Sequence, residues 1–527
     1  MNKPKLTLTS LNTLLKNRFD KGFKTLKDIP QPSLLLNADV AAIRIAKAIK
    51  NKERITLIGD YDVDGVTSTA IVKLFFEQID YPLTAIIPNR FRDGYGVSAK
   101  ILENVEADVV ITVDNGISAI EAAKICKERG IDLIITDHHT PSEILPDAFT
   151  IVNPKQEKCS YPFSEICGAQ VAWLVLAMLK KELDENIDMK QFLDLVALAV
   201  IADVMPLVDI NRAIVISGLN IMFNSTRPSS IIIREFLDKS KISSEDIAFS
   251  IAPRLNSAGR LEDASIALDF LTAKDTQTAF KIFEQLGCLN IARKEIEAEV
   301  TQEAIEQVDK NDKVIVVFGE GWNEGVVGIV AARLTQKFSR PAIVLSVEAG
   351  IAKGSARSLG KVNIHKLITT QKEFLIKFGG HSMAAGLSIG IENIEEFKKQ
   401  LNIEAQKISD SDFIPVNKSV GELEVGMINF DLLNLLDSYE PYGEANPRPA
   451  FNTTNADVIT TKLFGSDKSH TRLNIRLHSV DHNCYDLLAF REVLSMPHDR
   501  KISCSFSVNK NEWNGRVSIQ LLLDQLH

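Results

Sequence analysis

Acidic residues and histidines follow three apolar, strand-like runs of this chain. The three groups are Asp60, Asp62 and Asp64 after residues 54–59, Asp114 after residues 108–113, and Asp137, His138 and His139 after residues 131–136. Because the strands of a parallel sheet point the same way, the residues that follow them gather along one edge, where doubly wound sheets place their active sites. Carboxylates crowded there would repel one another unless divalent cations neutralised them. The pattern predicts a metal site built from distant segments, and it indicates phosphoester chemistry.

Residues 60–65 also match the start of an EF-hand loop. The twelfth position of such a loop should be Glu, but here it is Ile71, and the segment follows a strand rather than a helix. An EF-hand is therefore excluded. Taken alone, the segment leaves two alternatives to a metal site: an ordinary Asp-rich cap, and an anion site at the N-terminus of the helix that opens at Thr67.

Two of the nine histidines of the chain are adjacent, at positions 138 and 139. Successive residues of an extended chain do not both face one metal comfortably, so the two should differ in role. One would bind metal, and the other would reach the substrate as a general acid or phosphate contact. Hard oxygen ligands with one imidazole favour Mn²⁺ or Mg²⁺ over a thiolate-type zinc site. Two such ions about 3.5–4 Å apart can activate water and stabilise the leaving oxygen of an in-line displacement.

Short β-rich runs alternate with helical stretches from about residue 42 to 154, which is typical of βαβ units and a parallel α/β sheet. Further strands are expected at residues 83–88 and 149–152. Helices dominate residues 168–271, and the helix at 192–201 would deliver Asp203 at its end. One long, mostly polar helix at residues 273–308 suits a bridge between domains, although an ordinary surface helix has the same pattern.

The second half of the chain contains a further α/β region at residues 313–401, an expected linker at 409–418, and a segment of different character. In that last segment Ile502, Cys504, Phe506 and Val508 alternate at period two, and residues 513–515 predict a hairpin turn. Arg472, Asn474 and Arg476 would share one exposed strand face. This predicts a small β-barrel with a basic face, as in OB-folds that bind single strands, although a plain solvated strand would look the same.

The composition is that of an ordinary globular protein, with 45% hydrophobic and 24% charged residues over 527 positions, enough for about three domains. The formal net charge of −9 argues against a surface coated in basic charge, but it does not exclude a local basic groove. Residues 1–30 are locally basic, either as a solvated segment or as a DNA contact. The six cysteines form no C-x-x-C pair, and no apolar run is long enough for a membrane span. We therefore expect a soluble cytoplasmic protein.

Four ordered motifs resemble those of the DHH phosphoesterase superfamily. They are DYDVDG at residues 60–65, VDNG at 113–116, DHH at 137–139 and ADVMPL at 202–207. The resemblance implies a set of metal ligands made of Asp62, Asp64, Asp114, His138 and Asp203. It also implies that Asp114 bridges two cations, that Asp137 supports the site, and that His139 contacts the scissile phosphate. Asp60 stays open between ligand and support.

The second α/β region resembles the DHH-associated domain. The residues that this resemblance assigns to phosphate are Ser355, Arg357 and Ser358 in one segment, and Gly379, Gly380 and His381 in a Gly-rich turn at residues 379–386. Without the resemblance, that turn would be interpreted as a helix cap. Residues 319–325 do not have the Rossmann glycine spacing, so dinucleotide binding is not expected.

Further segments resemble the RecJ-type single-strand-specific exonucleases. They are residues 89–96 with Arg90 and Tyr95, residues 252–260 with Arg254, Asn256 and Arg260, residues 153–154, and residues 440–447 before the expected barrel. The resemblance covers about Asp39 to the C-terminus. Two residues depart from the family pattern: Gln170 follows Cys-Gly-Ala where Gly is usual, and Ala445 stands where a turn usually has Gly.

The resemblance implies a metal-dependent 5′→3′ exonuclease that degrades single-stranded DNA to mononucleotides in DNA repair and recombination. Arg90, Arg254 and Arg260 would grip the 5′ end or the backbone. Arg357, His381 and His139 would neutralise the charge that builds on phosphate oxygens. The partners that it implies are single-stranded DNA, a helicase and a single-strand-binding protein, with the chain itself a monomer.

The expected domains are a basic segment at 1–40, a catalytic domain at 41–272, a connecting helix at 273–309, a DHH-associated domain at 310–405 and an OB-fold at 415–527. Two other functions are considered. A DHH phosphodiesterase acting on short oligonucleotides, cyclic dinucleotides or pyrophosphate would lack the terminal barrel. A catalytically dead scaffold would have lost ligands, yet every candidate ligand is present.

Overall fold

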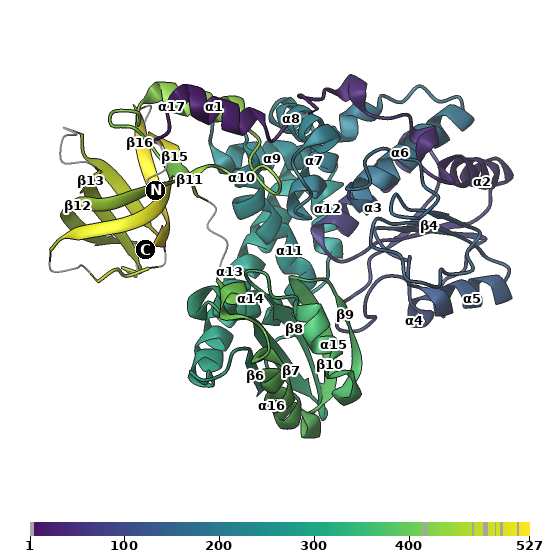
Figure 1. The fold of residues 1–527 in the computed structure, drawn as a ribbon. Coiled ribbons are helices and arrows are strands. Elements are labelled where there is room, and N and C mark those ends of the chain that lie inside the picture. Colours follow the sequence, from purple (N-terminus) through teal and green to yellow (C-terminus); the bar gives the residue numbers. More distant parts are fainter. Residues whose placement is uncertain are drawn as a thin grey trace. The chain divides into compact units, whose positions relative to one another are not determined.

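The computed structural model describes residues 5–19, 21–414, 419–465, 468–477, 483–490, 492–495, 499–513 and 516–527. The chain forms two compact units (Figure 1). One comprises residues 30–203 and 217–416, and it contains two β-sheets and most of the helices. The other comprises residues 1–29, 204–216 and 417–527, and it contains the third sheet. Across the described ranges, no helix is both long and apolar enough to cross a membrane.

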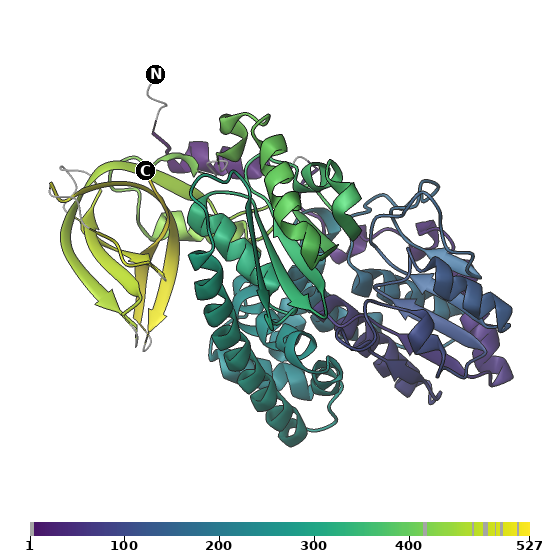
Figure 2. The same cartoon turned by 90° about the horizontal axis from the view of Figure 1, so that it is seen from below.

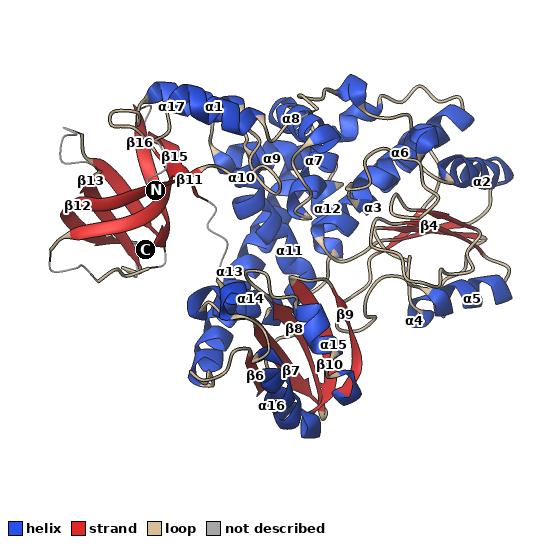
Figure 3. Cartoon of the chain, viewed as in Figure 1, coloured by secondary structure: helices blue, strands red, loops and turns tan. Residues whose placement is uncertain are grey.

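The first sheet is parallel throughout and has the order β2-β1-β3-β4-β5. Its strands are β1 Ile55–Ile58, β2 Thr84–Ile86, β3 Val109–Val113, β4 Asp132–Thr136 and β5 Thr150–Val152. The helices beside it are α2 Ala38–Asn51, α3 Val63–Gln78, α4 Ala99–Leu102, α5 Ile120–Glu128 and α6 Gly168–Glu182. Helices cover both faces (Figure 3), which is why the strands are apolar on both sides. The predicted parallel α/β sheet is confirmed.

A mostly helical region follows. Its helices are α7 Leu193–Ala202, α8 Asp209–Asn224, α9 Pro228–Leu237, α10 Ser244–Asp246, α11 Ala252–Leu261, α12 Ser265–Leu271 and α13 Thr276–Glu306, with a π-helical turn at Ile247–Ile251 before α11. Helix α7 is almost entirely apolar and buried, and Asp203 follows its last residue. The predicted long helix is α13, the long teal helix of Figure 2, and it packs against α11 and also against α14 (Val327–Phe338) of the next domain.

The second sheet is mixed, with the order β6-β7-β8-β10-β9, and only β6 and β7 are parallel. Its strands are β6 Ile315–Glu320, β7 Ala342–Glu348, β8 Ile351–Arg357, β9 Leu375–Gly380 and β10 Ala384–Gly390. The remaining helices here are α15 Ile364–Thr369 and α16 Ile394–Ala405. The glycine-rich segment at 379–386 is the β9–β10 hairpin, so the alternative interpretation as a helix cap is wrong.

The third sheet closes into a barrel because β12 pairs with both β13 and β15, and β14 pairs in parallel with β16. Its strands are β11 Ser419–Glu422, β12 Ala450–Phe464, β13 His470–Arg476, β14 Tyr485–Ala489, β15 Lys501–Trp513 and β16 Arg516–Leu526, with helix α17 at Phe430–Ser438. The predicted β-barrel is therefore present. Of the predicted turn at 513–515, residues 514–515 lie outside the described residues, and Trp513 and Arg516 beside them are paired in register.

The basic N-terminal segment is part of the barrel unit. Leu11 and Leu15 of α1 (Leu8–Lys16) are fully buried in the same core as Leu432 and Leu436 of α17. The Leu6 N–H also donates to the carbonyl oxygen of Glu422 at 2.7 Å. Both alternatives considered from the sequence, a solvated tail and a DNA contact, missed this role: the apolar face of α1 completes a hydrophobic core.

Candidate metal centre

The predicted ligands meet at the carboxyl ends of β1, β3 and β4. In the strand order 2-1-3-4-5 successive strands are added on one side of β1 and then on the other, so the strand order reverses between β1 and β3. This is the topological switch point where such sheets bind ligands. Asp62 caps α3, because its carboxylate accepts the N–H of Gly65 at 3.0 Å. Asp114 follows β3 with a left-handed backbone at φ 63°, a conformation that Asp tolerates better than most residues.

His138 lies at the centre of the cluster. Its Nε2 atom is 3.1 Å from Asp114 Oδ1, 3.5 Å from Asp203 Oδ2 and 3.7 Å from Asp64 Oδ2. Three overlapping groups have potential ligand atoms within 4.8 Å of one another: Asp60, Asp62 and Asp114; Asp64, His138 and Asp203; and Asp114, His138 and His139. Asp114 and His138 each belong to two of these groups, so they link the three groups into one cluster.

The chemistry of these atoms fits divalent cations. Both carboxylate oxygens of Asp114, Nε2 of His138 and Oδ2 of Asp203 are buried, and none has a hydrogen-bond partner among the described residues. Buried polar atoms are normally paired, so a cluster of unpaired acceptors indicates a missing positive partner. Carboxylate oxygens with one imidazole are the donors that Mn²⁺ and Mg²⁺ accept.

The electrostatics agree with this interpretation. Burial, and then repulsion from neighbouring carboxylates, raises the pKa of Asp64 to about 6 and that of Asp203 to about 8. The same causes raise the pKa of Asp60 and Asp114 well above the usual range. Burial, followed by the nearby charge of His139, lowers the pKa of His138 to about 3. Without a cation the site therefore disfavours the carboxylate charges of Asp60, Asp64, Asp114 and Asp203, which a metal would stabilise, and it keeps His138 neutral.

The N-terminus of α6 supports Asp64. The N–H groups of Gly168 and Ala169 donate to its two oxygens at 2.6 and 2.9 Å. A Cβ on Gly168 would lie 2.5 Å from Asp114, so only glycine allows this approach. Gln170 caps the same helix, since its Oε1 accepts the Cys167 N–H at 3.0 Å. Gly168 and Ala169 were not predicted from the sequence as site residues.

Asp137 and His139 form a supporting pair beside the cluster. Asp137 Oδ1 lies 2.7 Å from Nδ1 of His139 and also accepts the backbone N–H groups of His138 and His139. The hydroxyl of Tyr95 is 3.5 Å from Nε2 of His139. Burial lowers the pKa of His139, but the bond and charge of Asp137 outweigh it and raise that pKa to about 9. His139 can therefore present a proton to an anion.

Three of the predicted arginines gather near the cluster. The Arg90 guanidinium lies 4.2 Å from the centre of the Tyr61 ring, and Arg260 Nη1 donates to the Gly325 carbonyl at 2.8 Å. Burial, and then the charges of Arg90, Arg293 and Arg357, lowers the pKa of Arg260 to about 10. Arg357 Nη1 bonds Ser355 Oγ at 2.6 Å. Like charges so close together indicate a site for an anion.

Other predicted site residues have different surroundings. Arg254 packs against the rings of Phe236 and Phe283, 4.3 Å from each ring centre, and donates to the Phe283 carbonyl at 3.3 Å. The hydroxyl of Ser358 donates to the carbonyl of Val362 at 2.6 Å. Asn256 is half-buried on α11, and His381 is exposed beside Gly379 and Gly380 in the β9–β10 hairpin.

The predicted basic face of the barrel is partly neutralised. Arg472 of β13 forms an ion pair with Asp486 of β14, which also accepts a bond from Asn474 at 3.2 Å, and the Arg476 Nε is buried. A cluster of rings that was not predicted from the sequence lies near the β12–β13 connection, where Phe464, His470 and Phe490 are 5.1–5.7 Å apart. Phe490 is 55% exposed, and the exposure of a phenylalanine side chain cannot be predicted from the local sequence.

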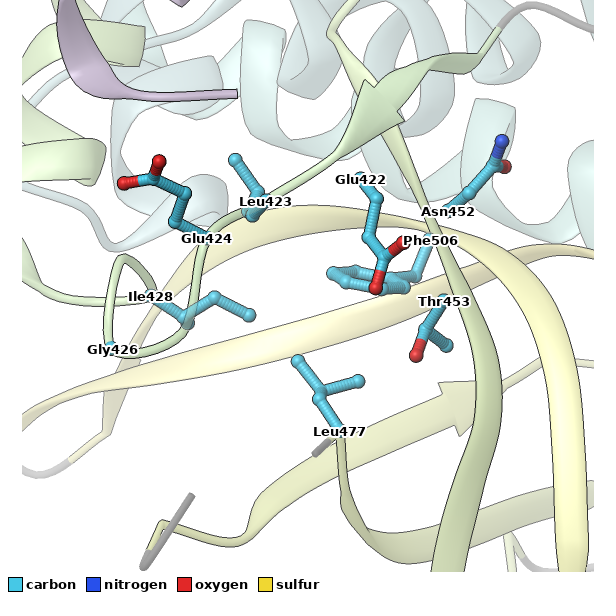
Figure 4. Close-up of a pocket in the computed structure, with 9 residues that line it drawn as sticks. All are labelled: Glu422, Leu423, Glu424, Gly426, Ile428, Asn452, Thr453, Leu477 and Phe506. Atoms are coloured by element: carbon cyan, nitrogen blue, oxygen red, sulfur yellow. The ribbon is translucent and has the colours of Figure 1, made fainter. Parts of the chain in front are cut away.

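A small pocket in the barrel unit is shown in Figure 4. It is lined by Glu422, Leu423, Glu424, Gly426, Ile428, Asn452, Thr453, Leu477 and Phe506. Its free volume of about 10 Å³ is that of a single water molecule. Buried oxygens of Asn452 and Thr453, unpaired among the described residues, would bond such a water. The pocket is too small for a nucleotide.

Comparisons with known proteins define the class. The model of the DHH family, N-terminal domain, matches residues 54–200, the DHHA1 domain matches 311–407, and the RecJ OB domain matches 421–525. The fold is thus that of a DHH-family protein with an associated DHHA1 domain and a terminal OB barrel.

Individual relatives are more specific. The chain is 33% identical to the single-stranded-DNA-specific exonuclease RecJ of Haemophilus influenzae, over 95% of this chain and 92% of that protein. It is 36% identical to RecJ of Bacillus subtilis over 94% of this chain, and it spans 64% of that relative's length. The crystal structure of Thermus thermophilus RecJ with Mn²⁺ superposes with a TM-score of 0.78 and 28% identity, covering 94% of this chain and 72% of that one. The chain belongs to the RecJ family of exonucleases.

Proposed function

We propose that this protein is a metal-dependent exonuclease that degrades single-stranded DNA from the 5′ end to mononucleotides, in DNA repair and recombination in the cytoplasm. The observation that carries the proposal is the cluster of buried, unpaired carboxylate and imidazole atoms at the switch point of the parallel sheet. Membership of the RecJ family supports the choice of substrate, because curated relatives bear the name single-stranded-DNA-specific exonuclease.

The proposed cation ligands are Asp62, Asp64, Asp114, His138 and Asp203, with Asp60 as a further ligand or support. When bound, two Mn²⁺ or Mg²⁺ ions would supply an activated water and positive charge facing the phosphate. His139, oriented by Asp137, would donate from Nε2 to a phosphate oxygen as negative charge builds there. Asp64 would stay fixed in place by the α6 N-terminus.

The strand phosphates would contact a second group of residues. Arg90, Arg260, Arg357 and Ser355 would form its centre, because the charges of Arg90, Arg357 and Asp62 all act on Arg260 and because Arg357 bonds Ser355. Further candidates are Asn256, Gly379, Gly380 and His381. Arg254 and Ser358 are better explained by packing and hydrogen bonding within the protein.

The barrel would guide the strand. Bases would stack on the rings of Phe464, His470 and Phe490, with Arg472 and Arg476 near the backbone. A helicase and a single-strand-binding protein would supply the substrate to a monomeric enzyme.

The test is digestion of long single-stranded DNA labelled at either end, with Mn²⁺ or with EDTA, by the wild type and by Asp114→Ala. Early release of the 5′ label as mononucleotide, abolished by EDTA and by the substitution, is the expected result. Asp147→Ala, which changes an exposed carboxylate paired with Lys127, is the matched control and should behave as wild type.

Cleavage of dinucleotides alongside intact long strands would instead support the alternative, a DHH phosphodiesterase for short or cyclic substrates. The closed barrel counts against that alternative, since small substrates need no surface for a long strand. Tight strand binding without hydrolysis of either substrate would show a scaffold and contradict the proposal.

A further inference from the structure

A buried network of charges joins α13 to α14. Glu297 of α13 is 1% exposed, and its two oxygens pair with different arginines. One is Arg293, a turn earlier on the same helix, and the other is Arg333 of α14. Arg293 Nη2 in turn donates to Oδ1 of Asn290 at 2.8 Å. The network thus fixes one side chain of α14 to a defined point on α13.

Stability alone is a poor explanation for such a network. Burying charges carries a large desolvation penalty, and apolar residues of similar volume are often at least as stabilising. An ion pair instead restricts geometry: a carboxylate that contacts two arginines allows few arrangements of the helices that carry them. The network is therefore better explained by a need to hold α14 in a particular position.

The N-terminal end of α14 contacts the residues that are proposed to bind phosphate. The carbonyl of Gly325, just before the helix, accepts the bond from Arg260 at 2.8 Å. A Cβ on Gly328, in the first turn, would lie 3.2 Å from Nη2 of Arg357 and 3.3 Å from Oγ of Ser355. A shift or rotation of α14 would therefore move Arg260 and Arg357 relative to each other.

Helix α13 also fixes α11, which carries Arg260. Ser257 Oγ contacts the carbonyl of Leu286 at 3.3 Å, and Arg254 bonds the carbonyl of Phe283. A Cβ on Gly287 would lie 2.7 Å from Arg254, so the two helices pack closely. One half of α13 thus sets the position of α11, and the other half sets that of α14.

We propose that Glu297 and Arg333 are positioning residues for phosphate binding: through α13 they set α14 where Arg260 and Arg357 converge on one phosphate of the strand. The inference rests on the proposed function, because it assigns a role within the same site. It requires no direct contact between Arg333 and the substrate.

The test uses the full chain with Arg333→Gln. This substitution leaves Glu297 paired with Arg293, so folding should be preserved, and removes only the link between the helices. Lys337→Gln, which removes the same charge from an exposed position of α14, is the matched control. The measurements are the Kd of inorganic phosphate, kcat and KM on a 5′-phosphorylated oligonucleotide, the Kd of Mn²⁺, and Tm.

We expect the Kd of phosphate and the KM of Arg333→Gln to rise about tenfold, because small misplacements remote from the reacting atoms are costly. Its kcat and Mn²⁺ affinity should stay unchanged, and Lys337→Gln should match the wild type. Arg333→Lys, which keeps a cation beside Glu297, should recover most of the affinity for phosphate.

An unchanged Kd of phosphate and KM in Arg333→Gln, whatever its Tm, would show a merely structural network and overturn the inference. A loss of kcat and Mn²⁺ affinity with unchanged phosphate binding would also overturn it. Phosphate binding is measured without turnover, so weakened binding in Arg333→Gln would support the inference even if the wild type digested no DNA. A wild type that digested no DNA would contradict only the proposed function.

Discussion

Asp137 fixes the ring of His139 rather than adding another free carboxylate to the cluster. Its Oδ1 lies 2.7 Å from His139 Nδ1, and its Oδ2 accepts the N–H of Ile117 at 2.9 Å. Burial raises the pKa of Asp137, but the bonds and charge of His139 outweigh it and leave that pKa below its usual value. The Asp137 carboxylate therefore stays charged and accepts a hydrogen bond from Nδ1 of His139. This bond orients the ring so that Nε2 turns toward the site.

Asp137→Asn should reduce kcat about 10- to 100-fold, as loss of an orienting partner usually does. Asp137 raises the pKa of His139 to about 9, so protonated His139 persists until the pH passes that value. In the variant this pKa should fall, and activity on single-stranded DNA should decline at lower pH than in the wild type. The measurement is kcat against pH with saturating Mn²⁺.

Asp132→Asn is the control for that experiment, since Asp132 begins β4, the strand that Asp137 follows, and pairs with Arg44. It should leave the pH profile unchanged. If Asp137→Asn lost activity only because it no longer bound Mn²⁺, its orienting role would be contradicted.

Without cations, the protein should lose stability as pH rises. The pKa values of Asp64 and Asp203 are raised from 3.8 to about 6 and about 8, so the folded state binds protons there that the unfolded state has released. The contribution of these groups is greatest below about pH 4 and is lost as pH rises through 6 and 8. Tm in EDTA should therefore fall over this window.

Mn²⁺ should reverse the trend, because its ligands must be deprotonated to bind it. Thermal unfolding from pH 5 to 9, in EDTA and in Mn²⁺, tests both statements. Asp203→Asn removes one of the titrating groups and should flatten the slope in EDTA. A Tm in EDTA that rises toward pH 8 would count against the proposed cluster of repelling carboxylates.

Gly168→Ala should weaken the Mn²⁺ affinity about 10- to 100-fold, since the new methyl group would lie 2.5 Å from Asp114 and displace it. Titration calorimetry with Mn²⁺ measures the effect, and Tm in EDTA reports on folding. Ala169→Gly, the control, adds no atom and keeps the N–H that bonds Asp64. Equal Mn²⁺ affinity in wild type and Gly168→Ala would show that Asp114 does not bind the metal.

Ala445→Gly should stabilise the barrel unit by about 1 kcal/mol, because Ala445 has a left-handed backbone at φ 59° that favours glycine. The residue lies in the turn where Gly443 and Asn446 pair, so its conformation is set by neighbouring bonds. Denaturant unfolding measures the change. The exposed Ala349, also left-handed at φ 49° but in a different turn, provides a comparison as Ala349→Gly.

Much of the fold could be predicted because buried parallel strands appear in the sequence as continuous apolar runs. Acidic residues that follow such strands must lie along the same edge of the sheet. The runs at 54–59, 108–113 and 131–136 became β1, β3 and β4, and their following residues formed the cluster. The motif containing Asp203 was placed correctly at the end of an apolar helix.

Other features depended on partners that no local pattern reveals. Backbone N–H groups such as those of Gly168 leave no side-chain signal, so their bonds to Asp64 were missed. Arg254 was predicted as a phosphate contact, and its packing against Phe236 and Phe283 of other helices could not be predicted from the sequence. Arg472 was predicted on an exposed basic strand face, and its ion pair with Asp486 of the neighbouring strand was not predicted.

The burial of Leu11 and Leu15 beside α17 has a consequence for the order of events on the ribosome. Helix α1 is synthesised long before the barrel that covers it, which begins with β11 at Ser419. At about 5–20 residues per second, the apolar face of α1 would wait roughly 20 to 80 s for its partner strands. Until then that face is available to chaperones or to other nascent chains, so the earliest helix is among the last to reach its final place.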